Sequence, residues 1–268
     1  MTNKITFYKR LMALAFACGT LLTACVQEDV MTPLAGEAKV RLSLDAQTAF
    51  STNTKAYVDE NDYKQIDNYT VEIRKNDASG ETVKSGKYSE LKSTPISLSR
   101  GDYYVKAYMG REEAASREVF YATDATSFSI LDESTKTISL NCKPTCAKCK
   151  VVFNDNMAEY FSDYYITYST AALGNNVATW AKGDSAPWYL KVGQNETVKA
   201  TIHYARKSDG KQQTAEWSRS LSPNEGWTLK VSANNNMTEG SMSVTITIDD
   251  STNDIPIDIT VPSDWINK

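Results

Sequence analysis

Residues 39–44 read KVRLSL, an uninterrupted alternation of polar and apolar side chains. Residues 69–74, YTVEIR, repeat the pattern. A period of two is typical of β-strands that bury one face. Similar stretches follow at residues 102–108, 126–131, 135–142, 149–153, 164–168, 188–192, 196–204, 212–221, 226–231, 241–248 and 257–261. Only residues 156–161 predict a short helix or turn, so the sequence predicts an all-β fold.

Turn-forming stretches separate these strands, for example at residues 76–80 and 99–102. Such spacing is typical of antiparallel β-sandwiches. About 240 residues follow the N-terminal apolar run, which is large for one sandwich and comfortable for two. We therefore predict two tandem sandwich domains, residues 37–145 and 146–268.

The stretch GDYYVKAY, residues 101–108, shows how one strand divides its side chains between two faces. Tyr103, Val105 and Ala107 fall on one face, which we expect to be core. Tyr104 and Tyr108 fall on the other, beside the Lys of this stretch. That second face is either an aromatic binding strip or ordinary cross-strand packing.

An apolar run at residues 11–24 follows Lys4, Lys9 and Arg10 and ends at Cys25. Residues 22–25, LTAC, resemble the lipobox of bacterial lipoproteins. The resemblance implies a signal peptide at residues 1–24, cleavage before Cys25 and a diacylglyceryl group on the Cys25 thiol. The run is shorter than the roughly 20 residues of a transmembrane helix, so we expect lipid, not polypeptide, to hold the chain on the membrane.

Residues 25–36 lack a periodic pattern and predict a flexible tether. Glu28 and Asp29 lie just past the cysteine and resemble the export signal that sends Bacteroidetes lipoproteins to the outer face of the outer membrane. The resemblance implies an outer membrane lipoprotein exposed at the cell surface. The alternative is an ordinary solvated linker.

Removal of residues 1–24 takes away three basic and no acidic side chains, which leaves 26 basic and 33 acidic residues and a net charge near −7. Nucleic acid is not an expected partner, because phosphate binding requires a basic stripe.

A family resemblance rests on G-x-Y-x-V-x-A at residues 101–107, the strand around Phe128, and the strands at residues 138–143 and 151–153. These motifs resemble cell-surface lipoproteins of unknown function from Bacteroidetes, whose immunoglobulin-like domains are akin to those of fimbrillin-related proteins. The resemblance spans residues 37–170 and implies tandem immunoglobulin-like domains displayed at the surface. It names no ligand.

Three cysteines, Cys142, Cys146 and Cys149, lie at the expected domain junction. We expect either one disulfide, in which Cys146 pairs with one of its neighbours, or buried thiols. A zinc site of these three with His203 is the sharper alternative. The C-x3-C-x2-C spacing lacks a second ligand pair, so we expect no metal and no cofactor.

Catalytic motifs are absent from the sequence, and we expect no enzyme. His203, the only histidine, lies inside an alternating run and predicts a structural role. A pair of carboxylates for glycoside hydrolysis stays open, because their separation cannot be read from sequence. Two acidic clusters, residues 59–62 and Asp249, Asp250 and Asp254, predict solvated turns rather than calcium sites.

Aromatic residues favour a binding function. Trp180 and Trp188 flank a turn-rich loop, and with Tyr189 they are the candidate ligand-binding residues. At most one of Trp188 and Tyr189 points inward, and we expect Trp217 and Trp227 to be buried.

The leading interpretation is a non-catalytic, lipid-anchored surface protein that binds an extracellular glycan or a surface protein. The alternative is a structural or assembly component of a fimbria-like or envelope complex. An exposed first strand (residues 39–44) or last strand (residues 257–261) that can be exchanged between chains would favour the alternative.

Overall fold

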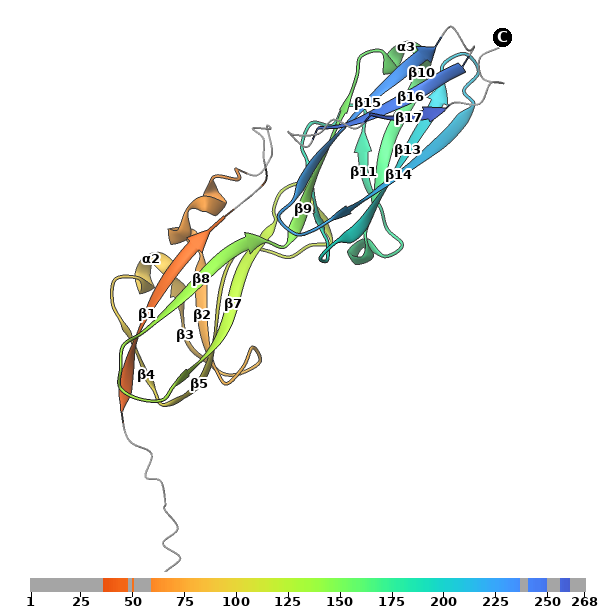
Figure 1. The fold of residues 1–268 in the computed structure, drawn as a ribbon. Coiled ribbons are helices and arrows are strands. Elements are labelled where there is room, and N and C mark those ends of the chain that lie inside the picture. The colour runs from red at the N-terminus through yellow and green to blue at the C-terminus, as the bar shows by residue number, and fades with distance from the viewer. Residues whose placement is uncertain (1–35, 48–49, 51–58, 237–240, 250–255, 261–268) are drawn as a thin grey trace, which may run out of the picture. The chain divides into compact units, whose positions relative to one another are not determined.

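The computed structural model describes residues 36–47, 50, 59–236, 241–249 and 256–260. Strands predominate in these ranges (Figure 1), and the all-β class is confirmed. The helices are single turns: α2 (Tyr88–Leu91), α3 (Met157–Tyr160) and the 3-10 turns at Asp62–Lys64, Ile66–Asn68 and Ala171–Leu173. α3 confirms the short helix predicted at residues 156–161. In this described part of the chain, every helix falls short of what a membrane span requires.

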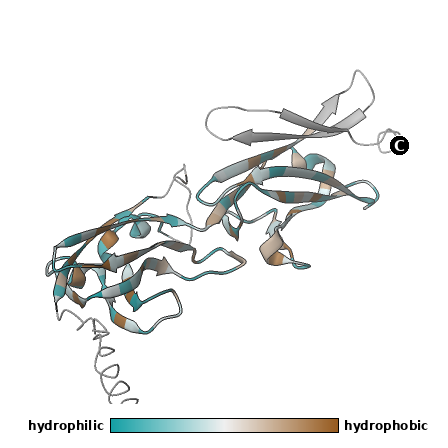
Figure 2. Ribbon diagram, turned by 60° about the horizontal axis from the view of Figure 1, so that its bottom comes forward, coloured by the Kyte–Doolittle hydropathy of each residue, from teal (hydrophilic) through white to brown (hydrophobic). Residues whose placement is uncertain are grey.

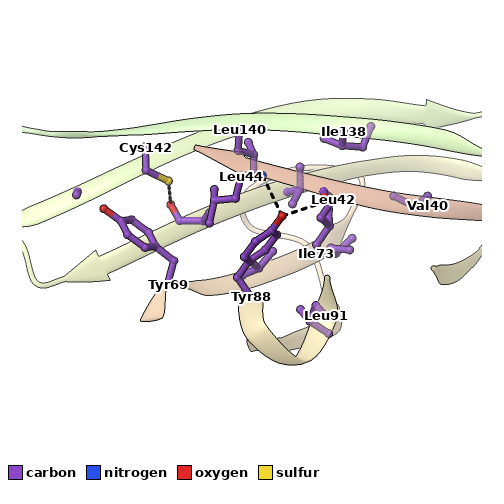
Figure 3. Packing of buried hydrophobic residues seen from close by; sticks show 14 of the residues in the cluster. Val40, Leu42, Leu44, Tyr69, Ile73, Tyr88, Leu91, Ile138, Leu140 and Cys142 are labelled. Atoms are coloured by element: carbon purple, nitrogen blue, oxygen red, sulfur yellow. Dashed lines mark hydrogen bonds between the residues drawn. The ribbon is translucent and has the colours of Figure 1, made fainter. Parts of the chain in front are cut away.

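The first group of strands follows the order β3-β2-β5-β7-β8-β1-β4. Its members are β1 (Glu37–Ala46), β2 (Thr70–Lys75), β3 (Thr82–Lys87), β4 (Ile96–Ser99), β5 (Gly101–Gly110), β7 (Tyr121–Ile130) and β8 (Lys136–Pro144). β7 and β8 pair through only two residue pairs. Side chains of β1 and β8 pack against those of β2 and α2 between the strands (Figure 3).

The opening alternation folds as predicted. Val40, Leu42 and Leu44 of β1 are buried, and the residues between them are exposed. The Tyr88 hydroxyl donates to the Leu42 carbonyl at 3.3 Å and accepts from the Leu44 amide at 3.3 Å, so α2 is joined to β1 (Figure 3). Hydrophobic and hydrophilic residues are interleaved along the coloured strands of Figure 2.

β5 also divides its side chains as predicted. Tyr103, Val105 and Ala107 are at most 4% exposed. Tyr104 and Tyr108 are partly exposed on the opposite face. The Tyr108 hydroxyl donates to a Glu72 carboxylate oxygen on β2 at 2.8 Å. This outer face therefore holds ordinary cross-strand contacts.

The second group of strands forms two sheets. One has the order β11-β10-β13-β14, and the other has the order β17-β16-β15-β9-β12-β6. Their bounds are β6 (Ala115–Ser116), β9 (Cys146–Phe153), β10 (Phe161–Ser169), β11 (Ala178–Ala181), β12 (Trp188–Lys191), β13 (Glu196–Arg206), β14 (Gln212–Leu221), β15 (Gly226–Asn236), β16 (Ser241–Asp249) and β17 (Pro256–Thr260).

Most pairs of the described strands are antiparallel, as predicted, and two are parallel. β1 pairs with β8 in parallel, from Val40 opposite Lys136 to Ala46 opposite Cys142. β9 pairs with β15 in parallel as well. Alternation determines which face of a strand is buried, but it carries no information on the direction of the neighbouring strand.

β6 belongs to the sheet of the second group, although its residues lie between β5 and β7 in the chain. Leu190 and Tyr189 of β12 pair with Ala115 and Ser116. The Tyr189 ring packs in the core of the first group of strands, where its centre lies 4.9 Å from that of the Phe120 ring. β6 of the first part of the chain thus pairs with the second group of strands, and Tyr189 of β12 packs against the first group.

Candidate ligand-binding surface

The sheet β11-β10-β13-β14 buries one face and exposes the other. On β13, Val198, Ala200 and Ile202 have no exposed surface and face the core. Because side chains alternate along a strand, His203 and Ala205 lie on the outer face, where both are partly exposed.

Two rows of side chains cross this outer face near the end of the sheet. In register, they are Tyr165, His203 and Thr214 in one row, and Asp163, Ala205 and Gln212 in the next. Ala205 carries only a methyl group, so a hollow of about 230 Å³ remains between its larger neighbours. Tyr204 and Gln213 complete its lining.

The aromatic part of the hollow is a stacked pair of rings. The Tyr165 and His203 rings lie 4.4 Å apart, centre to centre, with 7° between their planes. His203 Nε2 lies 3.0 Å from the Thr167 hydroxyl. These two contacts hold both rings in place before any ligand arrives.

Burial lowers the pKa of His203 below its ordinary value of 6.5. The imidazole is therefore neutral at pH 7. Asp163 is the only carboxylate in the lining. Besides Asp163 and the imidazole, the lining side chains carry two amides and three hydroxyls, each of which both donates and accepts hydrogen bonds.

This combination suits a polyhydroxylated ligand. Aromatic rings pack against apolar C–H faces, and carboxylate, amide and hydroxyl groups bind ligand hydroxyls with defined geometry. The surface is open and shallow, so it fits one or two units of a larger molecule better than a fully enclosed small molecule.

The residues predicted to bind ligand lie elsewhere. Trp180 and Tyr189 are both 1% exposed. Trp180 pairs in register with Ile166, which turns its ring to the buried face of the sheet. Trp188 is partly buried and packs against the core that contains Trp180. Its indole Nε1 donates to the Thr179 carbonyl at 3.0 Å. Of Trp188 and Tyr189, it is Tyr189 that points inward.

Arg117, the residue that follows β6, contacts the rings of both Trp180 and Trp188. Its guanidinium lies 4.5 Å from the centre of the Trp188 ring and 5.2 Å from that of Trp180. Arg117 Nη2 also donates to an Asp184 carboxylate oxygen at 2.5 Å and to the Thr179 carbonyl at 2.9 Å. The two rings therefore hold a cation of the protein itself.

Comparison with known proteins gives the chain a family. The model of a domain of unknown function, DUF4493, matches residues 36–263. The chain belongs to the DUF4493 family. The resemblance to a family of unknown function is thereby confirmed. No curated protein matches the DUF4493 chain.

Three solved structures illustrate what the DUF4493 chain is similar to. A "putative cell adhesion protein" of Bacteroides eggerthii shares 11% identity over 80% of this chain and 96% of that one, with a TM-score of 0.45. The fimbrial anchor protein Mfa2 of Porphyromonas gingivalis shares 12% over 84% and 100%, with a TM-score of 0.41. "Putative polysaccharide binding proteins" of Bacteroides thetaiotaomicron share 11% over 78% and 95%, with a TM-score of 0.40. None of them assigns a role to a residue of the DUF4493 chain.

Cys142, Cys146 and Cys149 are buried free thiols in the structure, which is the second of the two alternatives that the sequence leaves open. Burial raises the pKa of Cys142 to about 12 and raises those of Cys146 and Cys149 above the ordinary value. In the described ranges, no group of three His, Cys, Asp or Glu side chains could hold a metal ion. Cys25 lies outside these ranges.

In the acidic cluster at residues 59–62, Asp59, Asn61 and Asp62 are exposed as predicted, and Glu60 alone differs. Glu60 is not in a solvated turn, because one of its carboxylate oxygens lies 2.7 Å from Lys148 Nζ and accepts from the Tyr189 hydroxyl at 2.7 Å. Lys148 is 3% exposed. The side chains of Asp249, Asp250 and Asp254 lie outside the described part.

The two strands considered for exchange between chains differ. β1 pairs on both sides, with β4 and with β8. β17 ends its sheet and, among the described strands, pairs with β16.

Sequence reasoning missed Asp163, Ala205 and Gln212 altogether. The predicted strands at residues 164–168 and 196–204 end one residue short of Asp163 and Ala205, and only the one at residues 212–221 contains its member of the row. The sequence predicts a structural role for His203. The missing information is the register between β10, β13 and β14, which brings Tyr165 to His203. An aromatic residue on the polar face of a predicted strand was the one available signal.

Proposed function

We propose that the chain is a non-catalytic, lipid-anchored protein of the outer membrane, displayed at the cell surface, that binds an extracellular glycan through the hollow beside Tyr165. The observation that carries the proposal is the Tyr165–His203 ring pair next to Asp163 and Gln212. Sugars offer C–H faces to such rings and hydroxyl groups to such polar side chains.

The membrane address rests on the sequence. The apolar run, the basic residues before it and Cys25 occur in the order of a lipoprotein signal. Phase partitioning with Triton X-114 tests it. The native protein is expected in the detergent phase, and Cys25→Ala is expected in the aqueous phase. Partitioning of both into the detergent phase would refute a lipid on Cys25.

We further propose that residues 37–145 and 146–268 are two immunoglobulin-like β-sandwich domains. Two separate clusters of buried residues support the division. One comprises residues between 38 and 146 together with Tyr189, and the other comprises residues between 147 and 233. β6 is the exception, since it completes a sheet of the second domain.

Polysaccharide retention tests the binding function. The full-length protein is incorporated into neutral phosphatidylcholine liposomes and sedimented with a panel of insoluble polysaccharides. Wild type is expected to be retained by at least one of them, and Tyr165→Ala is expected to lose that retention. Tyr104→Ala is the matched control, because Tyr104 is also a partly exposed tyrosine on an outer sheet face.

Equal loss in both variants would place binding outside the hollow. Retention by no polysaccharide would overturn the glycan function. Envelope assembly would then be favoured, and its supporting observation is the position of β17 at the end of its sheet. Pro substitution at Ile257, a backbone change in that strand, is expected to abolish self-association in the assembly case only.

A further inference from the structure

The hollow contains one side chain with a formal charge at pH 7, and that charge is negative. Asp163 supplies it, and neither lysine nor arginine lines the hollow. His203 is the only lining residue that could become a cation near neutrality, and burial disfavours its charged form. The lining therefore offers an anion no counter-charge.

The cations on the surrounding elements lie outside the described lining of the hollow. On β13, Arg206 Nε donates to an Asp209 carboxylate oxygen at 2.8 Å, and Lys199 lies 2.6 Å from the Glu216 carboxylate on β14. Behind β11, Lys182 donates to the Ser162 carbonyl at 3.3 Å. Lys207 donates to the Ala158 carbonyl at 3.1 Å, and Lys211 directly precedes Gln212. None of these cations is among the residues that line the hollow, so a ligand there meets the charge of Asp163 first.

A carboxylate in such a place recognises hydroxyl groups. Its two oxygens accept hydrogen bonds and donate none, so they match two neighbouring hydroxyls of one sugar ring. A carboxylate or sulfate on the ligand would face Asp163 across a short distance, and juxtaposed like charges weaken binding strongly. Specificity can rest on such a repulsive element as well as on attractive contacts.

We propose that the hollow takes an uncharged saccharide with a vicinal diol against Asp163, and that this carboxylate excludes uronic, sialic and sulfated sugars. The inference rests on the proposed glycan function and adds the class of glycan. Asp163 is then a specificity-determining residue, separate from the ring pair that supplies packing.

The test uses ligands that differ in charge. Full-length protein in neutral liposomes is sedimented with yeast mannan, barley β-glucan, polygalacturonate and the methyl ester of polygalacturonate, each immobilised on beads. Polygalacturonate and its ester share a backbone and differ mainly in the carboxylate. The wild type is expected to be retained by a neutral polymer at least about tenfold better than by polygalacturonate.

Asp163→Asn keeps the shape of the side chain and removes its charge. It is expected to reduce the ratio of neutral to acidic retention by about tenfold. Asp102→Asn, a change of an exposed aspartate on β5, is the matched control and should leave the ratio unchanged. Thermal unfolding of each variant verifies that the fold persists.

The outcomes separate the two proposals. Stronger retention on polygalacturonate than on every neutral polymer, lost in Tyr165→Ala, would overturn the charge selectivity and keep the site. An unchanged ratio in Asp163→Asn would overturn the role of Asp163. Retention on no polymer would overturn the glycan function and this inference with it.

Discussion

The guanidinium of Arg117 lies 4.5 Å from the centre of the Trp188 ring, and the two residues come from segments that are distant in the chain. Asp184 and Trp180 complete the surroundings of this cation. The two tryptophans that the sequence predicts as ligand-binding residues thus contact the guanidinium of Arg117 instead.

Removal of this cation is expected to lower stability. Arg117→Ala loses the ring contacts and the hydrogen bond to Asp184, and we expect the free energy of unfolding in urea to fall by about 2 kcal/mol. The free energy of unfolding of Arg117→Lys should lie between those of wild type and Arg117→Ala, because an ammonium keeps the charge but lacks the planar face that stacks on a ring. Arg100→Ala, a change of an exposed arginine, serves as the control. Equal losses at positions 100 and 117 would contradict the assignment.

Thiol chemistry distinguishes buried thiols from a disulfide. In the folded protein, Cys142, Cys146 and Cys149 are expected to resist Ellman's reagent at pH 8, because burial excludes the reagent and raises their pKa values. In guanidinium chloride without reductant, three thiols should react in a Cys18→Ala, Cys25→Ala variant, which keeps only these three of the five cysteines. A count of one thiol would instead establish the disulfide.

Two tyrosine hydroxyls should respond oppositely to their removal. Tyr168 Oη is buried and has no hydrogen-bond partner among the described residues, whereas Tyr88 Oη bonds the backbone of β1 at two points. Tyr168→Phe is expected to leave the free energy of unfolding unchanged or to raise it by up to about 1 kcal/mol. Tyr88→Phe should lower it by about 1 kcal/mol. Chemical unfolding of both variants makes the comparison, and a larger loss at Tyr168 would point to an internal water on its hydroxyl.

The division of predicted from unpredicted structure follows the range of each interaction. Alternation along one strand is local, and so the cores at Val40, Leu42 and Leu44 and at Tyr103 and Val105 could be predicted. The partner of Trp188 is not local, because Arg117 reaches it only after β6 has paired with β12. The parallel pairing of β1 with β8 is also not local, because these are the first and last strands of the first group in chain order.

The candidate site shows the same limit. Each of β10, β13 and β14 could be recognised alone, yet the hollow exists only because Asp163, Ala205 and Gln212 share one register row. A shift of one residue in either pairing would turn a different set of side chains outward. His203 could be recognised as part of a strand, but the ring that stacks on it could not.

Filling the hollow is expected to abolish binding without unfolding the protein. Ala205→Leu adds three carbons where the hollow lies, so polysaccharide retention should fall at least about tenfold. Its free energy of unfolding should change by less than about 0.5 kcal/mol, since the side chain points outward. Ala125→Leu, an exposed alanine on β7, is the matched control. Full retention in Ala205→Leu would move the site elsewhere.

The pH dependence of stability should report on His203, the only histidine. Its pKa is lowered in the folded state, so the unfolded chain takes up the proton first as the pH falls below about 6.5. The free energy of unfolding contributed by the neutral ring is therefore present at pH 7 and declines as the pH falls through that range. Urea unfolding at pH 7, 6 and 5 should show a smaller decline in His203→Gln than in wild type. Parallel declines in both would exclude His203 as the cause.

The pairing of Ala115 and Ser116 with β12 affects how the chain can be inherited. A gene fragment that begins at Cys146 would encode a sheet whose outer strand exposes backbone donors and acceptors that β6 otherwise covers. The same fragment would lack Arg117 and would leave its two tryptophans without their cation. The halves are therefore not interchangeable cassettes. Recombination between relatives would therefore keep the fold of the C-terminal half intact only if residues 111–119 came from the same parent.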